Sequence, residues 1–165
     1  AIIGSMQGSF SQELDRQSAL GYLGDSLARL GAHAATQGVP LLYEPLNRYE
    51  TNLVHRVEQA DQLLARAGAE NVQLLADLFH MNIEEVSIAE ALCRCGDRLG
   101  HVHLADSNRQ AAGLGHLDYK PIAEALDKIN YGGYLSAEVF PLPNSQEAAM
   151  QTMRAIQTFF ATAGD

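Results

Sequence analysis

Short apolar segments alternate with longer amphipathic segments along the whole sequence. The short segments are apolar on both faces and bounded by turn residues, a pattern typical of parallel strands that helices bury on both sides. They lie at residues 1–4, 39–44, 72–77, 101–106 and 134–140. A repeated order of strand, helix and strand predicts an α/β fold with right-handed crossovers.

The longer segments carry apolar residues at steps of three and four, the spacing of one helix face. Glycine follows three of them, at Gly38, Gly68 and Gly96, where it can end a helix. We therefore expect helices over about 20–34, 54–67 and 83–95, a fourth that opens at Asp118, and a last one with an apolar stripe of Ala149, Met153, Ile156 and Phe160.

Two α/β architectures fit this order: an open doubly wound sheet and a (β/α)8 barrel. The turn after the first strand, GSMQGS, has neither glycine-rich phosphate-binding pattern, which weakens the case for a nucleotide-binding sheet. The strand ends recur about every 31 residues, so the chain holds about five units, whereas a barrel of about 250 residues holds eight. We expect one domain over residues 1–165, either an open five-stranded sheet or a barrel that lacks its first three units.

Four of the five strand segments finish with a side chain that can bind a metal: Glu44, Asp77, His103 and Glu138. The carboxyl ends of successive parallel strands meet at one rim, so these residues become neighbours there. Three carboxylates and one imidazole would repel one another without a cation, and the set suits Mn²⁺, Mg²⁺ or Co²⁺ better than a structural zinc. The alternative is that each acid caps the helix or turn that follows it.

Further polar residues come close to these strand ends. His80 lies three residues after Asp77, and Arg109 lies in the loop after His103, where it can meet a hydroxyl, carboxylate or phosphate group. Alternate strand side chains share a face, so His101 is expected one layer deeper than His103. This position favours a structural histidine over a metal ligand. For His80 and Arg109, capping or solvent exposure is the competing interpretation.

Composition excludes several classes of protein. Of 165 residues, 20 are acidic and 11 are Lys or Arg, giving a net charge of −9, which argues against a nucleic-acid backbone binder. No apolar run reaches the roughly 18 residues of a membrane span, and the first residues do not predict a signal peptide. Cys93 and Cys95 lie too close together for an ordinary disulfide, which favours a reducing cytoplasm.

Several motifs resemble a known family: YEPLNRYETN at 43–52, DLFHMNIEE at 77–85, HVHLADSNR at 101–109, GLGHLDY at 113–119 and SAEVF at 136–140. Together they resemble the xylose isomerase-like TIM barrels, and within these the ketose 3-epimerases. The likeness runs from the fourth strand of such a barrel to its last helix and covers nearly all of this chain. It implies a TIM barrel whose first three units are missing here, together with part of the substrate pocket.

The resemblance also implies site residues and a reaction. A divalent metal, usually Mn²⁺, would be held by Glu44, Asp77, His103 and Glu138, and the substrate contacted by Glu50, His80 and Arg109. The metal would bind two adjacent sugar oxygens and stabilise an enediolate, while Glu44 and Glu138 remove and return a proton on opposite faces. Epimerase and aldose–ketose isomerase differ here only in the carbon that receives the proton.

Two other functions stay open at this point. An endonuclease IV-like phosphodiesterase shares the barrel, but it needs more histidines and a basic DNA face than this acidic chain with six histidines offers. A non-catalytic half-barrel that binds a partner through its open edge is the second.

The same residues lead to two expectations about substrate and assembly. The chain has few basic residues, and its one candidate anion cradle is the weak GLG turn at 113–115. This predicts a free ketose or keto-sugar acid rather than a sugar phosphate. Unpaired edges at AIIG and YLSAEVF predict a homo-oligomer, unless further polypeptide covers them.

Overall fold

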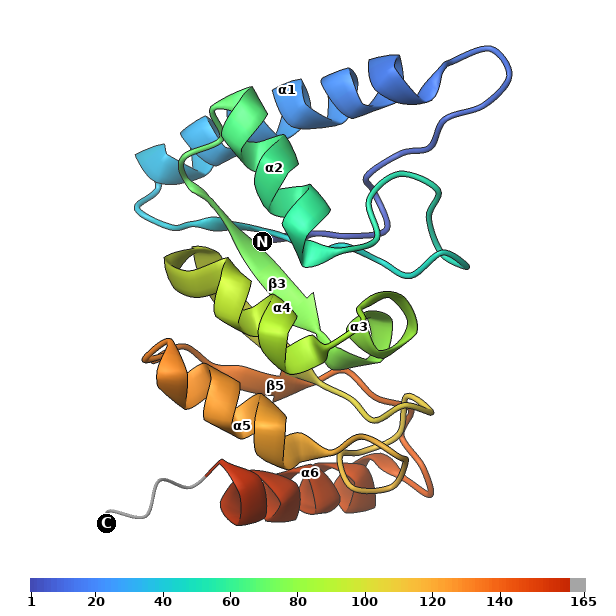
Figure 1. The fold of residues 1–165 in the computed structure, drawn as a ribbon, viewed down its shortest axis with the longest axis vertical. Helices are drawn as coiled ribbons and strands as arrows, with labels where there is room; N and C mark the ends of the chain where they lie inside the picture. The colour runs from blue at the N-terminus through green and yellow to red at the C-terminus, as the bar shows by residue number, and fades with distance from the viewer. Residues whose placement is uncertain (161–165) are drawn as a thin grey trace.

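The structure, a computed structural model, describes residues 1–160 and contains a five-stranded parallel sheet with helices between the strands (Figure 1). The strands are β1 (Ile2–Ile3), β2 (Leu41–Tyr43), β3 (Val72–Asp77), β4 (Leu99–Leu104) and β5 (Leu135–Ala137). The helices are α1 (Arg16–Thr36), α2 (Val57–Ala67), α3 (Leu78–Glu84), α4 (Ile88–Cys95), the 3₁₀ turn η1 (Gly96–Arg98), α5 (Tyr119–Lys128) and α6 (Ser145–Phe159). The strand–helix alternation that the sequence predicts is confirmed.

Polar caps decide where most of these helices begin. Asp15, Asp77, Asp118 and Asn144 each accept backbone N–H groups from the first turn of the helix that follows. Gly68 ends α2 with φ 64°, a left-handed conformation that glycine adopts without strain. These local signals account for the position of the helices relative to the strands.

The strands pair in chain order, from β1 to β5, and every pair is parallel. The register sets Asp77 of β3 opposite His103 of β4, so both strands end at the same level. Within residues 1–160, β1 and β5 are the two edges of the sheet. The core lies between sheet and helices and includes the fully buried Leu27, Leu64, Leu74, Leu92, Leu104 and Ile122.

Two predicted helices differ from the structure. The helix expected over 83–95 is two helices. Asp77, six residues before the expected start at 83, caps α3, and Ser87 caps α4 after a break at 85–87. In α6 the buried stripe is Ala148, Thr152 and Ala155, whereas Met153 is 52% exposed. The predicted stripe is right in part: Ile156 and Phe160 are half-buried and pack against the core, whereas Ala149 and Met153 are exposed.

The last strand is shorter than the sequence predicts. β5 ends at Ala137, so Glu138 follows the strand instead of lying inside it.

None of the helices over the described residues is both long and apolar enough to cross a lipid bilayer.

Candidate metal centre

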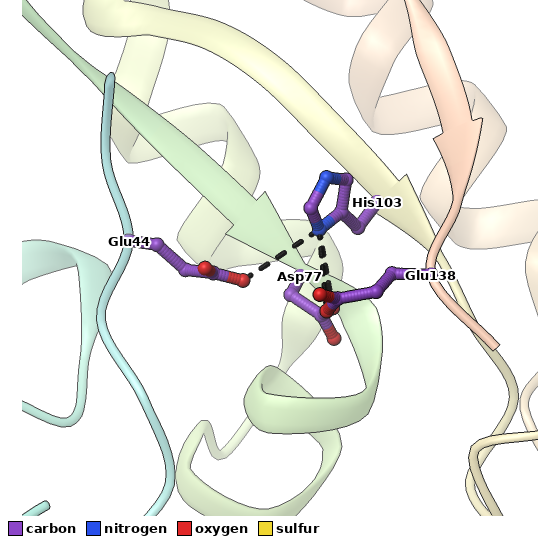
Figure 2. Close-up of side chains that lie close together, drawn as sticks. All are labelled: Glu44, Asp77, His103 and Glu138. Carbon is purple, nitrogen blue, oxygen red and sulfur yellow. Dashed lines mark ion pairs between the residues drawn. The ribbon is translucent and has the colours of Figure 1, made fainter. Parts of the chain in front are cut away.

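The ends of four neighbouring strands bring Glu44, Asp77, His103 and Glu138 together (Figure 2). One ligand atom from each side chain lies within 4.8 Å of the others. Glu44 follows β2 and Glu138 follows β5, while Asp77 and His103 belong to the central strands β3 and β4. The parallel register therefore gathers four side chains that are far apart in the sequence.

Local contacts fix the direction of the two carboxylates nearest the sheet. The Oδ1 atom of Asp77 accepts the backbone N–H groups of Phe79 and His80, which leaves Oδ2 to face the cluster. Glu44 packs against the end of β1, where a Cβ atom added at Gly4 would lie 2.7 Å from Glu44 Oε2. A glycine at position 4 therefore leaves the space that this carboxylate occupies.

His103 stands at the centre of the cluster. Its Nδ1 atom lies 3.6 Å from Glu44 Oε1, 3.5 Å from Asp77 Oδ2 and 3.6 Å from Glu138 Oε2. Burial acts to lower the pKa of His103, but the carboxylates of Asp77 and Glu44 outweigh it and raise the pKa to about 9. Burial likewise acts to raise the pKa of Asp77, and its contacts with His103 and His80 hold that pKa below the usual value.

The donor atoms of the cluster fit a divalent cation. Glu44 Oε1, Asp77 Oδ2 and His103 Nδ1 are buried and have no hydrogen-bond partner among residues 1–160. Buried polar atoms are normally paired, so three unpaired ones that face each other fit a site that binds a cation. Three carboxylates and one imidazole are a donor set for Mn²⁺, Mg²⁺ or Co²⁺.

Arg109 links two acids at the edge of this cluster. Its Nη1 atom donates to Glu50 Oε1 at 3.0 Å and its Nη2 atom donates to Glu138 Oε2 at 3.1 Å. The guanidinium also lies 4.9 Å from the centre of the Phe79 ring, a cation–π contact. The loop residue that the sequence placed near the site thus lies beside the four clustered side chains.

His80 and Glu50 occupy the same side of the site. His80 is 1% exposed, and its Nδ1 atom lies 3.9 Å from Glu50 Oε1. The structure therefore places all three expected substrate-contacting residues, Glu50, His80 and Arg109, around the cluster. Their contact with a substrate stays a prediction.

Two residues that the sequence did not predict support the site. Asn47 is 2% exposed and contacts His80. The Nε and Nη2 atoms of Arg48 donate to the buried Glu84, which ties the loop after β2 to α3. Both residues lie in the EPLNR stretch, but asparagine and arginine after a strand are equally common in solvated turns, so no sequence signal separated them.

His101 takes the structural place expected of it, one layer below His103. The two rings meet edge to face with centroids 5.3 Å apart, and His101 Nε2 lies 2.8 Å from Ser136 Oγ. Burial, followed by the charge of His103, lowers the pKa of His101. It is not one of the four clustered side chains.

Asp106 organises the loop that carries Arg109. Its buried carboxylate accepts the backbone N–H groups of Ser107, Gly113 and Leu117 at 2.7, 2.8 and 3.1 Å. A Cβ atom at Gly115 would overlap this carboxylate, which explains the second glycine of the GLG turn. The turn that resembled an anion cradle thus binds a carboxylate of the chain itself.

We expect Asp106→Asn to destabilise the fold by about 2 to 3 kcal/mol at neutral pH, because an amide nitrogen would face backbone N–H donors. Burial acts to raise the pKa of Asp106, but these donors outweigh it and hold the pKa below the usual value. The stabilisation is therefore complete above the unfolded pKa near 4 and is lost as the pH falls through the folded pKa. Urea unfolding at several pH values measures it.

The matched control is Asp127→Asn on the exposed face of α5, which should change stability little at any pH. A stability difference between Asp106→Asn and the native chain that stays constant down to pH 2 would contradict the role of the charged carboxylate.

A surface groove lies elsewhere, between α1 and α2, with Leu20, Gly24, Val54 and Leu63 among its lining residues. None of the four clustered side chains lines it. We place the candidate site at the cluster, because the convergent, unpaired donor atoms are there.

Comparison with known proteins agrees with this geometry. A family model described as xylose isomerase-like TIM barrel matches residues 2–157. The chain is 40% identical over 114 residues to a 3-dehydro-D-guloside 4-epimerase of Escherichia coli, and 41% identical over 115 residues to a D-psicose 3-epimerase of Enterocloster bolteae. These alignments cover 69% and 70% of this chain but 44% and 38% of the relatives, so the chain spans less than half of their length.

Solved structures of sugar epimerases share this fold. A crystal structure of D-psicose 3-epimerase in the presence of D-fructose superimposes with a TM-score of 0.87 at 25% identity, over 98% of this chain and 65% of that one. The structure of 3-keto-D-glucoside 4-epimerase from E. coli gives a TM-score of 0.84 at 28% identity, over 98% and 63%. A family match over almost the whole chain and the five parallel βα units of the partial barrel lead to one conclusion. The chain belongs to the xylose isomerase-like TIM barrel family.

Proposed function

We propose that this chain carries the catalytic centre of a divalent-metal-dependent epimerase that acts on a ketose or keto-sugar acid. The observation that supports this most directly is the convergence of Glu44, Asp77, His103 and Glu138, with three buried donor atoms unpaired among the described residues. The named activities of the relatives, which epimerise D-psicose and a 3-dehydro-D-guloside, point to the same chemistry. The proposed cation is Mn²⁺, and the two free cysteines suit a cytoplasmic setting.

Glu44 and Glu138 are the proposed acid–base pair. They reach the cluster from opposite ends of the group of strands, after β2 and after β5, as Figure 2 shows. One carboxylate would take the proton from the carbon next to the sugar carbonyl, and the other would return a proton to the opposite face. A bound divalent cation would supply the positive charge that stabilises the enediolate oxygens.

Glu50, His80 and Arg109 are the proposed substrate-holding groups. Arg109 already pairs with Glu50 and Glu138, so a hydroxyl group of the sugar would enter an existing hydrogen-bond network. His80 is buried among these groups, and its Nε2 atom has no hydrogen-bond partner in the described part of the chain. These three residues would orient the sugar between the two glutamates.

The donor set disfavours the nuclease alternative. The cluster holds one histidine among three carboxylates, and the net charge of −9 would repel a DNA backbone. A non-catalytic role would need the same cluster to bind metal without turnover, and the assay below separates the two.

The test is a ketose epimerisation assay on the Mn²⁺-loaded chain. We expect the chain to bind about one Mn²⁺ and to interconvert D-psicose and D-fructose, or another pair of ketose epimers, as measured by chromatography of the sugars. Bound Mn²⁺ without turnover on any ketose or keto-sugar acid would favour the non-catalytic half-barrel.

The proposed substrate is a free sugar, not a sugar phosphate. The GLG turn, the one anion cradle that the sequence indicated, is filled by Asp106, and the guanidinium of Arg109 is paired with two acids. We expect kcat/KM for a phosphorylated ketose to be no higher than for the free ketose. A tenfold or greater preference for the phosphate would overturn this proposal.

We also propose that the 165-residue chain self-associates through an open edge of its sheet. Within residues 1–160, β1 pairs with β2 alone, and Ile2 is 40% exposed. Met6, Tyr22 and Leu30 line a groove beside Ile3 of β1 and are 74%, 65% and 45% exposed. Exposed apolar strand edges pair readily with a second copy. Light scattering at micromolar concentration should show a dimer or larger species.

Ile2→Lys places a charge on this edge and should shift the chain toward monomer, whereas Arg154→Lys on α6 should not. A native chain that is monomeric in light scattering would contradict self-association.

A further inference from the structure

Asn47 lies in the loop after β2 and is almost fully buried, with 2% of its surface exposed. Its Oδ1 atom accepts the backbone N–H of Tyr49 at 2.9 Å. That contact fixes which end of the carboxamide is oxygen, because a backbone N–H can only donate. The Nδ2 atom therefore faces the site, 2.8 Å from His80 Nδ1 and 3.2 Å from Glu50 Oε1.

The surroundings of His80 Nδ1 contain two donors. Besides Asn47 Nδ2, the backbone N–H of Asn47 points at it from 3.3 Å. A ring nitrogen that receives N–H donors must offer its lone pair, so Nδ1 carries no proton in this arrangement. The proton of the neutral ring then belongs to Nε2.

Among residues 1–160, no competing acceptor is close enough to draw the proton to Nδ1. Glu50 Oε1 is the nearest carboxylate oxygen, at 3.9 Å, beyond hydrogen-bond distance. That oxygen already accepts from Asn47 Nδ2 and from Arg109 Nη1. The Asn47 carboxamide thus separates His80 from the carboxylate that would favour the other tautomer.

His80 Nε2 is buried and has no hydrogen-bond partner among residues 1–160. We propose that Asn47 is a positioning residue that holds His80 as the Nε2–H tautomer, so that the ring presents a hydrogen-bond donor to a sugar oxygen. The identity of that oxygen rests on the proposed epimerase function. The tautomer itself rests only on the contacts of Asn47.

Nitrogen NMR measures the tautomer directly. In a long-range ¹H–¹⁵N spectrum of the metal-free chain, recorded at one slightly alkaline pH without sugar, His80 should show an unprotonated Nδ1 and a protonated Nε2. The His80→Gln spectrum assigns the signals, because it lacks only those of His80. Native His80 with a protonated Nδ1 would overturn the proposal.

Two substitutions test whether Asn47 is the cause. Asn47→Asp keeps the size of the side chain but can place an acceptor opposite Nδ1, so Nδ1 should become protonated. Asn47→Ala removes the Nδ2 donor and retains the weaker backbone donor, so the Nδ1 signal should move toward a mixture of tautomers even where the aspartate variant does not fold.

Asn52→Asp is the matched control, since it makes the same charge change in the same loop. Asn52 exchanges hydrogen bonds with the backbone of Phe10 and does not contact His80. Its His80 signals should equal those of the native chain. His80 signals that stay native in both Asn47 variants would show that Asn47 does not set the tautomer.

The measurement needs neither turnover nor a bound sugar, so it separates this proposal from the proposed function. A chain with the Nε2–H tautomer and no epimerase activity would keep the role of Asn47 and remove the proposed reaction. An active chain with the Nδ1–H tautomer would do the reverse.

Discussion

Asp77→Asn should lower the affinity for Mn²⁺ by at least about 100-fold, more than the loss of an outer-shell partner of a metal ligand costs. The Oδ1 atom of Asp77 caps α3, and an asparagine can keep this contact. Its amide nitrogen would take the place of Oδ2, which faces the cluster, and an amide N–H₂ group cannot bind a cation. The substitution therefore removes one function of Asp77 and spares the other.

Calorimetric titration with Mn²⁺ measures this effect, and thermal unfolding without metal shows whether the cap survives. Asp118→Asn is the matched control, because Asp118 caps α5 in the same way through the N–H of Lys120 and lies outside the cluster. Equal Mn²⁺ affinity in Asp77→Asn and in the native chain would contradict the assignment of Asp77 as a ligand.

Glu50→Gln provides a second comparison. Glu50 is an acid near the same cluster but is not one of its four side chains. We expect this variant to retain Mn²⁺ affinity within a few-fold. Together the two variants distinguish a specific site from general attraction of cations by an acidic surface.

The position of the cluster could be predicted from sequence for a simple physical reason. Parallel strands end at one rim, so the residue type at each strand end is enough to predict which side chains meet. β3 was predicted with its observed bounds, and Asp77 and His103 lie opposite each other in the register. Glu138 joins the cluster although β5 ends one residue before it, since the chain continues along the rim.

The residues around the cluster could not be predicted in the same way. The contacts of Asn47 with His80 and of Arg48 with Glu84 span more than 30 residues and depend on where two loops meet. Likewise, the break between α3 and α4 follows from separate caps, Asp77 for α3 and Ser87 for α4, and not from the apolar pattern. Hydrophobic periodicity reports burial, whereas these features depend on individual hydrogen bonds.

The same limit applies to the GLG turn. From sequence, two glycines in a loop are compatible with an anion site, because both can expose backbone N–H groups. The structure shows that the anion is Asp106, seven residues before Gly113. A glycine-rich turn can therefore bind an acidic side chain that lies a few residues earlier in the same chain. This possibility should be tested before such a turn is assigned as a ligand site.

Glu138→Gln should slow ketose epimerisation by about 10³-fold, within the range that a positioned acid or base contributes. The carboxylates of the two proposed bases approach His103 Nδ1 from different sides (Figure 2). Glu44 Oε1 and Glu138 Oε2 each lie 3.6 Å from this atom. With Glu138 neutral, Glu44 can still remove and return a proton on its own face. One sugar epimer should therefore exchange its carbon-bound hydrogen for deuterium in D₂O without inversion.

Glu44→Gln should give the complementary result, with exchange confined to the other epimer. Proton NMR in D₂O follows exchange and inversion at once, under Mn²⁺ concentrations that saturate each variant, so that loss of a ligand is separated from loss of a base. Glu124→Gln, at an exposed position of α5, is the control and should invert at the native rate. If either glutamine variant exchanges both epimers equally, one base serves both faces, and the assignment of Glu44 and Glu138 to opposite faces of the sugar is wrong.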